Sequence, residues 1–146
     1  MSPEAAKGAA AAMRQQMLNS TKEQWEAGAR HGSIGMSRNP ANNERVAGWS
    51  LASDRATSAQ AMSELWGADL RPLLPKITAP TLVLGAWAAY EPMGSTMDST
   101  RKIFEGQYAG LAGVKVAMSP RGYHFLMWDD PEWLVGEVKG FLAAAR

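Results

Sequence analysis

Cysteine is absent from this chain of 146 residues. Its absence excludes disulfides, thiolate nucleophiles and metal sites built from cysteine. No stretch approaches the roughly 18 consecutive apolar residues of a membrane-spanning helix. The first residues, Met1 to Ala12, lack the basic and apolar segments of a secretory signal peptide. We therefore expect a protein of the bacterial cytoplasm.

The chain also lacks an excess of charge of either sign. Fifteen basic and fourteen acidic residues give a formal net charge of +1, and the two signs are interspersed. No basic run marks a nucleic-acid-binding surface. The length is that of one compact domain, and 46% hydrophobic residues is ordinary for a globular protein.

The N-terminal half of the chain has helical patterns only. Each of four segments begins with residues typical of a helix start, such as an N-cap side chain, a proline or a capping-box pair. Gly67 ends the fourth segment, in which Met62, Leu65 and Trp66 recur at helical spacing. The predicted helix starts are Ser2 with Pro3, Ser20 with Glu23, Asn39 with Pro40, and Asp54 or Thr57.

The pattern changes after a proline-containing linker at residues 69–80. A continuous run of β-branched residues and leucine at 81–85 predicts one strand, and the segment 114–118 predicts a second. The segment between them predicts a helix. A strand, a helix and a strand in this order predict a right-handed unit with parallel strands. Asp130 and Pro131 predict the start of a final helix. Its expected inner face consists of Leu134, Val135, Val138, Phe141 and Leu142.

Two motifs carry a family resemblance. The first is A-P-T-L-V-L-G, ending at Gly85, and the second is H-F-L-M-W-D-D-P-E-W, which begins about forty residues later at His124. In this order they resemble the C-terminal part of a bacterial α/β-hydrolase. The resemblance implies a helical cap-like region at 1–68 and a βαβα region at 69–146. The fold class it implies is α/β, a truncated α/β-hydrolase-like fold in one compact domain.

Only one catalytic position of the family has a clear match in this chain. His124 falls where the family has its general base. No G-x-S-x-G nucleophile elbow occurs in the chain, and the oxyanion-hole loop has no counterpart. The family's acid follows the strand that ends at Gly85, where Ala88 now stands near the usual aspartate. Glu91, three residues later, is the remaining candidate for the acid.

Several roles stay open for these side chains. His124 is a general base, a metal ligand, or a core histidine left without its nucleophile. Of the neighbouring Asp129 and Asp130, one is expected to cap the last helix. The other orients His124, binds a metal or is solvated. Ser119 follows a predicted strand, but without an elbow it is a poor nucleophile.

No cofactor is required by the sequence, although zinc is permitted. A catalytic zinc site needs about three protein ligands, whereas the chain has two histidines and no H-x-H or H-x-x-x-H spacing. An oligomer could assemble His124 with Asp129, Glu91 or His31 of the partner subunit. The alternative for His31 is a surface position that interacts with a helix dipole.

The chain has no counterpart of the N-terminal, nucleophile-bearing half of an α/β-hydrolase. Without that half, the strand at 81–85 keeps an unpaired edge, which is a template for pairing with another chain. The resemblance therefore implies association with a second copy. A two-fold homodimer is the simplest expectation, and an aggregating monomer is the alternative.

The expected function is weak, promiscuous hydrolysis of activated carboxyl or phosphate esters, with His124 as base or metal ligand. The alternatives are a non-catalytic module that self-associates or binds a small apolar ligand, and half of a split enzyme.

Overall fold

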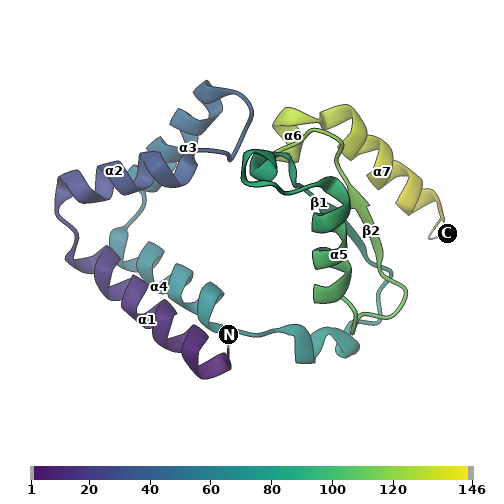
Figure 1. The fold of residues 1–146 in the computed structure, drawn as a ribbon, viewed down its shortest axis with the longest axis horizontal. Helices are drawn as coiled ribbons and strands as arrows, with labels where there is room; N and C mark the ends of the chain where they lie inside the picture. Colours follow the sequence, from purple (N-terminus) through teal and green to yellow (C-terminus); the bar gives the residue numbers. More distant parts are fainter. Residues whose placement is uncertain (1, 145–146) are drawn as a thin grey trace. The chain divides into compact units, whose positions relative to one another are not determined.

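The computed structural model describes residues 2–144, which divide into two units. The first unit contains residues 2–34 and 43–70, and the second contains residues 35–42 and 71–144. The segment 35–42 thus belongs with the C-terminal part of the chain, although it lies between helices of the first unit in sequence. Figure 1 shows the elements along the chain.

The first unit is built from helices whose starts are set by side-chain caps. Its helices are α1 (Pro3–Asn19), α2 (Lys22–Ser33), α3 (Pro40–Ala52) and α4 (Arg55–Gly67). The first three residues of α3 fall in the second unit, and the rest of α3 falls in the first.

Three of these caps are explicit. The Ser2 hydroxyl accepts from the Ala5 amide, and the Asp54 carboxylate accepts from the Thr57 amide at 2.8 Å. Hydrogen bonds from the backbone and side chain of Thr57 lower the pKa of Asp54 below its usual value. The capping box of α2 pairs Thr21 with Gln24, so the predicted start at Ser20 is one residue early.

Helices α1 and α4 pack through small side chains. Ala10 and Ala59 are buried, and a Cβ atom at Gly67 would lie 3.5 Å from the Cβ of Ala10. Leu65 and Trp66, which recur with Met62 at helical spacing, remain 68% and 63% exposed. The narrow interface between alanine and glycine positions does not extend far enough around α4 to cover these large side chains.

The second unit centres on two parallel strands. Strands β1 (Leu82–Gly85) and β2 (Lys115–Met118) pair in register from Leu82 opposite Lys115 to Gly85 opposite Met118. Helix α5 (Met97–Gln107) connects them, and Figure 1 shows α5 and α7 (Pro131–Ala144) on opposite sides of the sheet. The shorter elements of this unit are the 3-10 helices η1 (Arg71–Lys76) and η2 (Ala88–Met93) and the helix α6 (Leu126–Asp129).

The predicted fold class is wrong. Residues 2–144 are mostly helical and contain one sheet of only two strands, rather than an α/β-hydrolase-like architecture. Both predicted strands are present and parallel, but the described sequence contains no other run that forms a strand. The remaining apolar residues recur at helical spacing, so helices form the rest of the chain.

The predicted inner face of α7 is also partly wrong. Leu134 and Phe141 are half-buried as expected. Val135, Val138 and Leu142 are 46%, 39% and 57% exposed. A sheet of two strands is narrow, so it covers one side of α7 and leaves apolar side chains on the other. Within residues 2–144, no helix combines the length and the apolar character needed to cross a membrane.

Candidate functional site

His124 lies in the loop between β2 and α6 and is exposed. Its ring meets the Phe125 ring edge-on, with centroids 5.1 Å apart and an interplanar angle of 89°. The Phe125 ring in turn packs on the Trp128 ring, with ring centroids 4.5 Å apart. Among residues 2–144, no hydrogen bond or ion pair engages the His124 imidazole. The imidazole is therefore accessible to solvent and stands beside a small aromatic cluster.

Asp129 holds two separate segments of the second unit together. Its carboxylate accepts from the Ser37 hydroxyl at 2.7 Å and from the Arg38 amide at 3.0 and 3.1 Å. It also accepts from the Tyr123 amide at 3.0 Å. These bonds fasten the segment 35–42 to the loop that carries His124. Asp129 makes no hydrogen bond with His124, so it does not orient the imidazole in this structure.

A backbone contact makes the same connection. The Phe125 amide donates to the Met36 carbonyl oxygen at 2.9 Å. The residues on both sides of His124 are thus fixed, Tyr123 by Asp129 and Phe125 by Met36. The loop presents the imidazole from a backbone held at two points.

Asp130 belongs to a second polar network, and this network is buried. Its carboxylate accepts from the Ser119 hydroxyl at 2.8 Å and from Nε of Arg121 at 3.1 Å. Ser119 is fully buried, and its hydroxyl oxygen accepts from the Gly122 amide at 2.8 Å. A Cβ atom at Gly122 would lie 2.8 Å from that oxygen, so the network requires glycine there. A buried hydroxyl in these bonds cannot act as a nucleophile on a substrate from solvent.

The N-cap position of α7 is Asp130, but its carboxylate is used elsewhere. The Asp130 carbonyl oxygen accepts from the Leu134 amide at 3.0 Å, as expected at a helix start. Its carboxylate binds Ser119 and Arg121 instead of the first-turn amides. The two adjacent aspartates therefore both tie loops together.

Substitution of Asp129 tests whether this carboxylate is structural. We expect Asp129→Ala to lower the free energy of unfolding by about 2 kcal/mol, because three donor groups lose a charged acceptor. Urea denaturation measures the change. Glu91→Ala is the matched control, because Glu91 is exposed, and it is expected to change stability by less than about 0.5 kcal/mol. Equal effects of the two substitutions would contradict the structural role.

The other candidate side chains do not join His124. Glu91 lies in η2 and is exposed, and no hydrogen bond or ion pair links it to His124 among the described residues. His31 is exposed in the last turn of α2, where a basic side chain complements the helix dipole. Across residues 2–144, no group of three or more His, Asp or Glu side chains is arranged to hold a metal ion.

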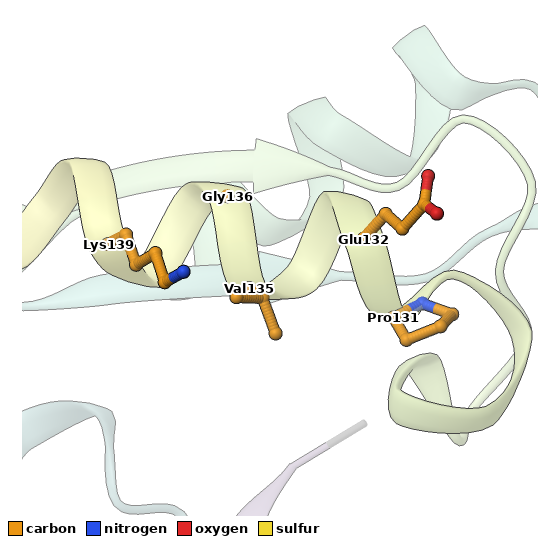
Figure 2. Close-up of a pocket in the computed structure, with 5 residues that line it drawn as sticks. All are labelled: Pro131, Glu132, Val135, Gly136 and Lys139. Carbon is orange, nitrogen blue, oxygen red and sulfur yellow. The ribbon is translucent and has the colours of Figure 1, made fainter.

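Figure 2 shows a shallow depression on the surface of α7, the helix that begins seven residues after His124. Its lining comes from one helix, and it combines apolar groups with one acid and one base. The lining residues are Pro131, Glu132, Val135, Gly136 and Lys139.

Ser37 and Ser119 have structural roles that sequence reasoning did not assign. Ser37 lies 92 residues from Asp129, so no local pattern indicates the pairing. For Ser119 a signal exists, because a small polar residue at a strand end is followed within three residues by a glycine. That pattern is typical of a tight turn with a side-chain bond to the backbone.

No protein-family model, curated protein or solved structure matches the chain. The resemblance to α/β-hydrolases remains a prediction from the two sequence motifs.

Proposed function

We propose that this chain hydrolyses activated carboxyl or phosphate esters weakly and with a broad substrate range. His124 acts as the general base that activates water. The observation that carries the proposal is an exposed imidazole on a loop whose backbone is fixed on both sides. The neighbouring carboxylates, Asp129 and Asp130, are engaged in holding that loop.

The proposed step needs only one protein group. The neutral imidazole of His124 accepts a proton from water as the water oxygen attacks the carbonyl carbon or the phosphorus. The bond to the leaving oxygen then breaks, and a p-nitrophenolate departs as an anion without needing a proton. The imidazolium returns its proton to solvent. Because no second acid assists the leaving group, the proposal is confined to esters with good leaving groups.

The same arrangement explains why the activity is expected to be weak. General acid–base catalysis alone contributes about 100-fold to 10,000-fold. Asp129 and Glu91 do not hydrogen-bond His124 in the described residues, so the imidazole lacks an orienting partner there. The rings of Phe125 and Trp128 offer an apolar surface next to the imidazole, which favours aryl esters.

The pH dependence of hydrolysis tests the proposal. We expect the rate with a p-nitrophenyl ester to rise with pH and then level off, because only neutral imidazole is a base. Initial rates at constant ionic strength, corrected for the protein-free reaction, give the profile. A flat profile at buffer-like rates would contradict catalysis by His124 and favour a ligand-binding module.

Chelation separates the two roles proposed for His124. If His124 acts as a general base, the hydrolysis rate is unchanged after dialysis against a chelator. If His124 is a metal ligand, the rate falls after dialysis and Zn²⁺ restores it. In the second case the zinc would supply the hydroxide, since bound zinc lowers the pKa of water towards about 7. The measurement is the ester-hydrolysis rate before dialysis, after dialysis and after adding Zn²⁺.

A second candidate function is a non-catalytic, self-associating module. Large apolar side chains are exposed in both units, including Leu65, Trp66 and Leu142. In the described chain β1 pairs only with β2, so each strand has one unpaired edge. We propose a homo-oligomer, most simply a dimer, for either function. The pH–rate profile distinguishes the two functions.

A further inference from the structure

We propose that the outward face of α7 pairs antiparallel with α7 of a second copy of this chain. The two-fold axis would pass between Val135 and Gly136. This proposal does not depend on ester hydrolysis, because none of its residues belongs to the His124 loop.

The first argument is the distribution of apolar residues around α7. Trp133, Leu134 and Phe141 are half-buried. Val135 and Leu142 follow Leu134 and Phe141 in sequence, about a quarter turn further round the helix, and are 46% and 57% exposed. A helix that is apolar on both sides needs a cover for each of them. The two-stranded sheet covers one side of α7, and the outward side is left for a partner.

The second argument is charge. Glu132 and Lys139 line the depression beside Val135, and Figure 2 shows them at its two ends along the helix. They are seven residues apart, which is about two helical turns, so both lie on one side. An antiparallel copy related by the proposed axis brings each Glu132 opposite Lys139 of the partner subunit. A two-fold interface must be complementary to itself in this way.

The third argument is the shape of the same surface. A Cβ atom at Gly136 would meet no atom within 4 Å, and the same is true at Gly140. Glycine weakens the interior of a helix, but it allows a partner helix to approach closely. About the proposed axis, Val135 of one copy falls opposite Gly136 of the other. The depression thereby receives an apolar side chain.

The mixed charge of the face selects a second copy over other occupants. One acid and one base next to valine and glycine do not form a surface of single sign for nucleic acid or an anionic membrane. They do match an identical face turned by 180°. Because α7 has fourteen residues, the paired helices extend about 21 Å. Such a contact is small, so we expect a dimer that dissociates on dilution.

Charge reversal tests the pairing. Sedimentation equilibrium over a wide concentration range would compare the wild type with Glu132→Lys, Lys139→Glu and the double reversal. Each single reversal replaces two attractive pairs by two repulsive ones, and we expect the dissociation constant to rise at least about tenfold. The double reversal restores both pairs and should return to within about threefold of the wild type. Circular dichroism spectra verify that all four proteins keep their helices.

Two results would overturn the proposal. A wild type that is monomeric at every concentration would mean that another segment or molecule covers this face. A dimer that tolerates both single reversals would place the interface elsewhere, for example at the open edges of the sheet. Neither result bears on the His124 mechanism, which is judged by ester hydrolysis.

Discussion

Replacing His124 by alanine is expected to lower the rate of p-nitrophenyl ester hydrolysis about 100-fold, the smaller end of what general acid–base catalysis contributes. The substitution removes the base and adds no new group. It should leave the fold intact, because the imidazole is exposed and its described contact is the edge of the Phe125 ring. The measurement is the initial rate per chain for the wild type and the variant, prepared identically and compared at equal oligomer size.

The second histidine provides the matched control. His31 is exposed and lies on α2, in the other unit of the chain. We expect His31→Ala to retain the wild-type rate within about twofold, since substitution of an exposed residue seldom disturbs the rest of the fold. Equal rates for the wild type and His124→Ala would mean that His124 has no catalytic role. A loss in both variants would point to a site that needs both imidazoles, as in a metal centre.

Replacing Asp130 by alanine is expected to lower the free energy of unfolding by about 3 kcal/mol. Asp130 is 3% exposed and receives hydrogen bonds from Ser119 and Arg121. Its removal leaves the buried Ser119 hydroxyl without its acceptor and opens space behind it. Arg121 is half exposed and can turn to solvent, so the main loss comes from the buried part of the network.

Urea denaturation with a double-mutant cycle isolates this contact. The cycle combines Asp130→Ala with Ser119→Ala, and we expect a coupling free energy of about 1 kcal/mol or more for a hydrogen bond to a charged group. Asp130→Asn keeps an oxygen acceptor of the same shape and should lose less than Asp130→Ala. A loss below about 1 kcal/mol for Asp130→Ala would contradict a structural role for this network.

The local starts of the helices were predictable because caps depend on neighbouring residues. Ser2 and Asp54 both occupy the predicted N-cap positions, and α7 begins at Pro131 as expected. The same holds for the two strands, each of which was predicted from a segment of five residues. In each case the information lies within a few residues of the element.

The long-range features were not predictable in the same way. The fold class was inferred from a resemblance to a larger sheet, whereas the described residues contain only β1 and β2. The pattern of α7 could not show which apolar residues face the sheet, because they occur on both sides of the helix. The hydrogen bonds that Asp129 accepts from Ser37 and Arg38 connect segments about ninety residues apart, and no local rule indicates them.

The central claim is that protonation of His124 controls ester hydrolysis. Because the chain has only two histidines, the His31→Gln variant leaves a single imidazole that NMR can follow without ambiguity. The measurement is the titration midpoint of His124 in this variant, compared with the midpoint of its pH–rate profile. We predict that the two midpoints coincide and that the rate follows the neutral fraction of the imidazole. A kinetic midpoint that differs clearly from the NMR midpoint, or a rate independent of pH, would contradict the account.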